Sequence, residues 1–83
     1  MNKIALVTGA SSGIGWATAV FLAEEGYDLI ICGRRQERLM ELAKQVKAKT
    51  YPLLFDVSKH EEVKQALNAL PEAWQKIDVL VNN

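Results

Sequence analysis

The sequence predicts an α/β fold with a doubly wound parallel sheet. Four short apolar runs, rich in β-branched residues, alternate with three amphipathic runs along the 83 residues. Continuous apolar runs are typical of strands buried on both faces, and strands separated by helices imply βαβ units. Right-handed crossovers then favour the strand order 3-2-1-4, with the first two helices on one face and the third on the other.

The first half of the chain supplies two strands and two helices. The first strand is predicted over residues 3–8, just before a glycine-rich turn, and the second over residues 28–33. The first helix is expected over residues 16–25, where Ala17, Val20, Phe21 and Ala23 recur at helical spacing, with Gly26 ending it. The second helix is expected over residues 36–47, because Leu39, Leu42, Ala43 and Val46 share one helical face.

The second half supplies the third strand, the third helix and the fourth strand. The third strand is predicted over residues 50–55, and Pro52 suits an edge position because proline cannot donate to a ladder. Ser58 and Glu61 have the spacing of a capping box at the start of a helix that runs on to Leu70. Residues 71–74 then form a short turn, and the fourth strand is predicted over residues 77–81.

Composition limits the partners. Ten Lys and Arg balance ten Asp and Glu, which gives no electrostatic case for nucleic acid or an anionic membrane. No apolar run approaches the roughly 20 residues of a membrane span. The only histidine, His60, is expected at the surface and has no metal-site spacing, and the only cysteine, Cys32, is expected to be a small buried residue. A cytoplasmic protein without disulfides is therefore predicted.

A glycine-rich turn, TGASSGIG over residues 8–15, joins the first strand to the first helix. Gly9 would permit the tight turn, Gly13 would let backbone approach a pyrophosphate, and Gly15 would let helix and strand pack closely. The hydroxyls of Ser11 and Ser12 and the helix N-terminus would donate to phosphate oxygens. An ordinary glycine-rich loop is the alternative, but the glycine spacing and the strand-turn-helix context favour a Rossmann-type phosphate site.

The end of the second strand indicates which dinucleotide binds. NAD-selective Rossmann proteins carry a carboxylate there, which accepts from the ribose 2′-hydroxyl. This chain has Arg34 and Arg35 after Gly33 and no acid. Arginine pairs with a 2′-phosphate, so NADP is the predicted cofactor. The alternative is that both arginines only begin a solvated helix, although cations are disfavoured at a helix N-terminus.

Three motifs resemble those of the short-chain dehydrogenase/reductase family. TGASSGIG is similar to its TGxxxGxG motif, Asp56-Val57 follows the third strand, and Asn82-Asn83 resembles the start of its NNAG motif. The resemblance implies that Ile14 joins the turn in binding cofactor, that Asp56 faces the adenine amino group, that Val57 offers its backbone and that Asn83 lies beside the adenosine ribose. From the residues alone, Asp56 is equally well explained as a turn residue before the helix.

Within the family, the runs GRRQERL and LPxxWxxIDxLVNN are most similar to NADP-dependent 3-hydroxy acid dehydrogenases of the serine type. The family implies hydride transfer between NADP(H) and an alcohol or carbonyl, with a tyrosine acid/base and a lysine four residues later. Tyr27 and Tyr51 are followed at that spacing by Ile31 and Phe55, so no catalytic residue is predicted in this chain. Residues 1–83 are expected to be the N-terminal half of a single Rossmann NADP-binding domain, with the catalytic half absent and no activity of their own.

Two function classes remain open from the sequence. The chain is either the cofactor-binding part of an oxidoreductase that acts on a small molecule and is expected to form homo-oligomers, or part of a non-catalytic NADP-binding or redox-sensing Rossmann protein. An epimerase or an enoyl reductase is a further alternative. Fold alone does not separate these classes, whereas a downstream Tyr-x-x-x-Lys would.

Overall fold

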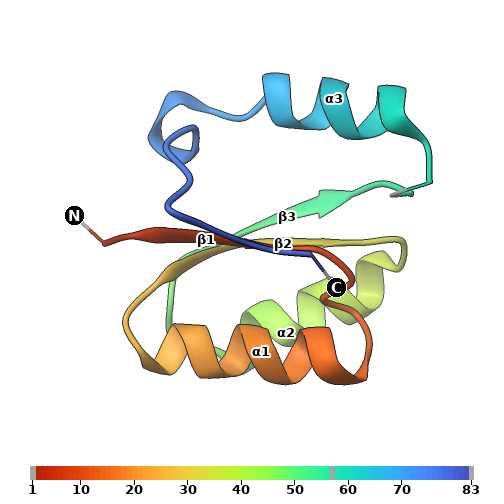
Figure 1. The fold of residues 1–83 in the computed structure, drawn as a ribbon. Coiled ribbons are helices and arrows are strands. Elements are labelled where there is room, and N and C mark those ends of the chain that lie inside the picture. The colour runs from red at the N-terminus through yellow and green to blue at the C-terminus, as the bar shows by residue number, and fades with distance from the viewer. Residues whose placement is uncertain (1, 57, 83) are drawn as a thin grey trace.

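The computed structural model describes residues 2–56 and 58–82 and has two helical layers around one sheet (Figure 1). The sheet is parallel, with the order β3-β2-β1-β4 that the sequence predicts. In chain order, its elements are β1 (Ile4–Val7), α1 (Gly13–Glu24), β2 (Asp28–Gly33), α2 (Gln36–Gln45), β3 (Thr50–Leu54), α3 (His60–Asn68), the 3-10 turn η1 (Glu72–Trp74) and β4 (Val79–Val81). Helices α1 and α2 cover one face of the sheet and α3 the other, as expected (Figure 1).

The two central strands hold the core together. All of β1 and nearly all of β2 is buried, because each pairs with a neighbour on both sides and carries helices on both faces. Alternate residues serve opposite layers: Ala5, Val7, Leu29 and Ile31 join the cluster beneath α1 and α2. Their neighbours in sequence join the cluster beneath α3, namely Ile4, Leu6, Ile30 and Cys32. The apolar runs of the sequence are therefore strands buried on both faces.

The end of α1 depends on a glycine. Gly26 has φ of +97°, in the left-handed region that residues with a Cβ rarely adopt. Its N–H donates to the Ala23 carbonyl, and the N–H of Tyr27 donates to the Leu22 carbonyl, both at 3.1 Å. These are the bonds of a Schellman motif, which satisfies carbonyls that the helix leaves open. The chain can then turn directly into β2.

The two helical layers are packed unequally. On one face α1 buries Gly15 and Ala19, and α2 buries Leu39 and Leu42. On the other face no described residue of α3 is buried. Partly buried side chains of α3 still contact the second cluster, and Tyr51 and Trp74 add a tilted ring contact with centroids 5.6 Å apart. The layer formed by α3 is therefore packed less deeply against the sheet than the layer formed by α1 and α2.

Several element ends differ from the sequence expectation. Helix α1 begins at Gly13, three residues earlier than expected, because the start of a helix tolerates glycine better than its interior does. Helix α2 ends two residues early, at Gln45, and β4 begins at Val79. Phe21, expected on the apolar face of α1, is 58% exposed. Ends of elements are the least determined part of a periodic pattern.

The predicted capping box at Ser58 and Glu61 is wrong. Lys59 occupies the N-cap position of α3 and no side chain caps the helix. The Ser58 hydroxyl instead donates to Asp56 Oδ1 at 2.8 Å. The Ser58 backbone N–H, which the box would pair with the Glu61 carboxylate, also donates to Asp56 Oδ1, at 3.0 Å. The Asp56 carboxylate therefore takes the place that Glu61 would have in the box.

Other expectations concern single residues. His60 is exposed at the first turn of α3 and Cys32 is buried in β2, as predicted. Among residues 2–56 and 58–82, no group of three or more His, Cys, Asp or Glu side chains is arranged to hold a metal ion. Within the same residues, every helix is too short or too polar to cross a bilayer.

The conformation of Gly26 generates a stability prediction. Gly26→Ala places a Cβ at φ of +97° and is expected to lower the free energy of unfolding by about 1 kcal/mol. Urea unfolding followed by circular dichroism measures the change. Glu24→Ala, at an exposed position in the last turn of α1, is the matched control and is expected to change the midpoint little. An unchanged Gly26→Ala midpoint would contradict the argument.

The burial of Cys32 generates a reactivity prediction. Burial raises the pKa of the Cys32 thiol to about 12, so almost no thiolate is present near neutral pH. Iodoacetamide at mildly alkaline pH is therefore expected to label the folded protein very slowly and the urea-unfolded protein readily. Mass spectrometry of the alkylated chain measures both rates. Fast labelling of the folded protein would show that this part of β2 opens or is exposed.

Candidate functional site

An open cleft of about 560 Å³ lies where the carboxyl ends of β1, β2 and β3 meet. This edge is where open parallel α/β sheets bind their ligands. The cleft is lined by Gly9, Ser11, Ser12, Gly33, Arg34, Arg35, Phe55, Asp56 and Ser58. The structure thus brings together residues that the sequence singled out in three separate segments: the glycine-rich turn, the arginine pair and Asp56.

The turn after β1 is tight and is tied to β2. Gly9 has φ of +62°, which supports its predicted role in the turn. The Ala10 N–H donates to the Cys32 carbonyl at 2.9 Å, so the turn begins as a continuation of the sheet. The backbone N–H and the hydroxyl of Ser12 both donate to the Gly9 carbonyl at 3.3 Å. These hydrogen bonds hold the backbone of the turn against the end of β2, beside the cleft.

The start of α1 leaves its backbone donors uncapped. Ser12 is the N-cap residue, but its hydroxyl does not cap the helix, and the first turn contains no acidic residue. Gly13 and Ile14 are exposed, Ile14 by 76%, and a Cβ added at Gly13 would meet nothing within 4 Å beyond its chain neighbours and the backbone of its own helix. Gly15 is buried, in keeping with its predicted packing role. These three residues lie beside the cleft lining, and the uncapped N–H groups can donate to an anion there.

The arginine pair is exposed at the end of β2. Arg34 and Arg35 follow β2, and Arg35 is the N-cap residue of α2 with no side-chain cap. Asp, Asn, Ser or Thr would stabilise a helix start better, because arginine offers no acceptor to the first N–H groups. Neither guanidinium forms a hydrogen bond or ion pair with any residue that the structure describes. Both remain available to an anionic ligand in the cleft.

Gly33 lets the turn approach the end of β2. A Cβ added at Gly33 would lie 3.0 Å from Ser11 Oγ and 3.3 Å from a Leu39 methyl carbon. Both separations are tighter than ordinary van der Waals contact. The absence of a side chain at Gly33 therefore allows the Ser11 hydroxyl to sit next to the residue that precedes Arg34.

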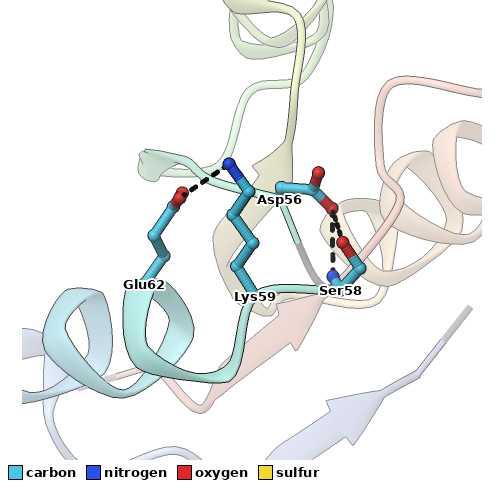
Figure 2. Close-up of polar contacts among 4 residues, drawn as sticks. All are labelled: Asp56, Ser58, Lys59 and Glu62. Atoms are coloured by element: carbon cyan, nitrogen blue, oxygen red, sulfur yellow. Dashed lines mark hydrogen bonds and ion pairs between the residues drawn. The ribbon is translucent and has the colours of Figure 1, made fainter.

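Asp56 is held in place by Ser58, as Figure 2 shows. Asp56 Oδ1 accepts from the Ser58 backbone N–H at 3.0 Å and from the Ser58 hydroxyl at 2.8 Å. These hydrogen bonds, with Arg34 and Lys59 nearby, hold the pKa of the Asp56 carboxyl below its usual value. Asp56 is thus a turn residue before α3 and also part of the cleft. The sequence had treated these two roles as alternatives.

Sequence reasoning missed three lining residues: Gly33, Phe55 and Ser58. The spacing of Asp56 and Ser58 is typical of a turn in which an aspartate binds its own backbone two residues on, so it could have indicated Ser58. Nothing local indicates Gly33, because its role depends on a residue 22 positions away in the glycine-rich turn.

Two predicted cofactor residues, Val57 and Asn83, lie outside the described residues. The structure does describe the residues next to them in the sequence. Asp56 and Ser58 both line the cleft, and the Thr8 hydroxyl lies 3.3 Å from Asn82 Oδ1, within hydrogen-bond distance. The end of β4 therefore lies beside the glycine-rich turn, which agrees with Figure 1.

Comparison with known proteins identifies relatives over nearly the whole chain. A family model described as short chain dehydrogenase matches residues 3–83. A probable NADP-dependent dehydrogenase of Dichelobacter nodosus is 46% identical over 80 residues, which are 96% of this chain and 76% of that protein. Serine 3-dehydrogenase of Agrobacterium fabrum is 42% identical over 83 residues, which are 100% of this chain and 33% of that enzyme.

Solved structures agree with the sequence comparison. The closed form of a serine dehydrogenase complexed with NADP+ superposes with a TM-score of 0.86 and 38% identity, covering 93% of this chain and 31% of that one. This chain spans about a third of the length of most of the curated relatives that it matches. The matched motifs, the strand order and these relatives together show that the chain belongs to the short-chain dehydrogenase family.

Proposed function

We propose that this chain is the cofactor-binding part of an NADP(H)-dependent oxidoreductase. The observation that carries the proposal is the pair of exposed guanidiniums, Arg34 and Arg35, which line the cleft at the end of β2 and form no hydrogen bond or ion pair with the described residues. A carboxylate at this place would repel a 2′-phosphate, whereas two arginines neutralise it.

The donor set of the cleft fits a dinucleotide with several phosphates. The hydroxyls of Ser11 and Ser12 and the uncapped N–H groups of α1 are all donors, and the space beside Gly13 is open. The volume of about 560 Å³ falls within the range of small-molecule sites. We assign the pyrophosphate to the turn and the start of α1, through Gly9, Ser11, Ser12, Gly13, Ile14 and Gly15, and the 2′-phosphate to Arg34 and Arg35.

Asp56 is suited to the adenine end. Ser58 occupies Oδ1 with two hydrogen bonds, and Asp56 Oδ2 forms no hydrogen bond with the described residues. That oxygen can accept from the adenine amino group, and the lowered pKa keeps the carboxylate ionised. By the family resemblance, the Val57 backbone and Asn83 complete the adenosine side of the site.

The bound nicotinamide would supply the hydride chemistry, and the residues of this chain would hold the other half of the cofactor. The proposal therefore includes a catalytic half outside residues 1–83, together with a small alcohol or carbonyl substrate and homo-oligomers of the whole protein. A cytoplasmic location is also part of it, and the unpaired thiol of Cys32 fits a reducing compartment. Serine 3-dehydrogenase is among the relatives, which supports a small 3-hydroxy acid as substrate.

The arginine pair generates the first functional prediction. The full-length protein is expected to bind NADPH more tightly than NADH, and Arg34→Ala is expected to reduce that preference about ten- to a hundredfold, because hydrogen bonds to charged groups are strong. Calorimetric titration with both cofactors measures the preference. Lys47→Ala removes an exposed positive charge that does not line the cleft and is the matched control. Equal affinities for both cofactors, or tighter NADH binding, would refute the proposal.

The substrate class is tested separately. The full-length protein is expected to reduce NADP+ with small 3-hydroxy acids such as serine, followed by NADPH absorbance over a panel of alcohols. Activity confined to steroids, sugars or acyl-carrier thioesters would contradict the prediction of a 3-hydroxy acid substrate. The proposal of an NADP(H)-dependent oxidoreductase would still hold. NADPH binding without turnover on any substrate would favour a redox sensor.

A further inference from the structure

A third arginine, Arg38, lies one helical turn beyond the arginine pair and differs from it in contacting the glycine-rich turn and α1. Its Nε donates to the Ser11 carbonyl at 3.3 Å. Its guanidinium carbon lies 4.6 Å from the centre of the Trp16 ring. Its Nη1 also lies 3.6 Å from Glu41 Oε2, an exposed ion pair that contributes little. One side chain of α2 thus bridges the glycine-rich turn and α1.

Ser11, the residue that Arg38 contacts in the glycine-rich turn, is held at both its backbone and its side chain. The Ser11 backbone is tied to Arg38 through its carbonyl, while the Ser11 hydroxyl fits into the space that Gly33 leaves open. Gly33 directly precedes Arg34, and Ser11, Gly33, Arg34 and Arg35 all line the cleft. The Ser11 hydroxyl and the arginine pair therefore belong to one corner of the site, although Ser11 and Gly33 are 22 positions apart in the sequence.

We propose that Arg38 is a positioning residue for the 2′-phosphate corner: it fixes the distance between the Ser11 hydroxyl and the arginine pair, and so raises selectivity for NADP(H) over NAD(H). The link to the 2′-phosphate rests on the proposed function, whereas the restraint on Ser11 does not. Arg38 itself is not part of the cleft lining.

The geometry requires an arginine and not merely a positive charge. A planar guanidinium can lie over the Trp16 ring and direct Nε toward a carbonyl at the same time, whereas an ammonium group is a compact charge without a fixed fork. Arg38→Lys therefore keeps the charge near the cleft and removes the geometry. This variant separates positioning from simple attraction of the phosphate.

The test compares Arg38→Lys with two matched variants in the full-length protein. Glu41→Gln removes only the exposed ion pair, and Lys44→Met removes an exposed charge near the end of the same helix. Calorimetry with NADPH and NADH is expected to show NADPH affinity falling about tenfold in Arg38→Lys, equivalent to about 1.4 kcal/mol, with NADH affinity changed less than about twofold. Trp16→Leu is expected to act in the same direction, and the two controls are expected to match the wild type.

An equal loss of affinity for both cofactors would show a merely structural role and overturn the proposal, as would unchanged NADPH affinity.

A second measurement needs no cofactor. Amide hydrogen exchange over residues 9–13 is expected to accelerate several-fold in Arg38→Lys and to stay unchanged in Lys44→Met. If the wild type fails to prefer NADPH, the proposed function fails, and the exchange rates still decide whether Arg38 restrains Ser11.

Discussion

The parallel pairing of β1 with β2 is the constraint on which the rest of the structure depends. Its register sets Val7 beside Ile31, and the ladder continues past β1 through the hydrogen bond from Ala10 to Cys32. The residues that follow the two strands must therefore emerge side by side at one edge of the sheet. Those residues are the glycine-rich turn and the arginine pair, so the site is a direct consequence of how the core is paired.

Burial on both faces makes that pairing rigid. Leu29, Ile30 and Ile31 are all 0% exposed, and each lies against a helical layer. A shift of register would move apolar side chains from one cluster to the other and separate the turn from the arginines. The rigid part of the molecule thus ends where the ligand-facing residues begin, an arrangement that keeps donor positions fixed without ordering long loops on binding.

The sequence predicted most of the architecture, because apolar runs and glycines carry local signals. The strands, the helix faces, the Pro52 edge and the turn at Gly9 follow from residues near one another in the chain, and the handedness of βαβ crossovers then favours the strand order. The predictions that failed, and the contacts that were missed, involve groups with competing hydrogen-bond partners or residues far apart in the sequence. The Ser58 backbone N–H had two candidate carboxylate acceptors, Asp56 and Glu61, and the pattern could not rank them. The contact of Arg38 with Ser11 joins positions 27 apart and leaves no periodic trace. Assignment of the cofactor residues themselves remains a prediction.

The last strand has a consequence for how the chain folds. The Ile4 N–H donates to Asp78 Oδ2 at 2.9 Å, and the Asp78 N–H donates to the Ile4 carbonyl at 2.8 Å, across a separation of 74 residues. During synthesis β1 leaves the ribosome first, yet one of its edges stays unpaired until β4 emerges, several seconds later at roughly 5–20 residues per second. Closing so long a loop is slow, because its entropy is lost before the contacts form. Until β4 emerges, the nascent chain carries an open apolar strand edge, and in this interval a chaperone or the translation rate can influence its yield.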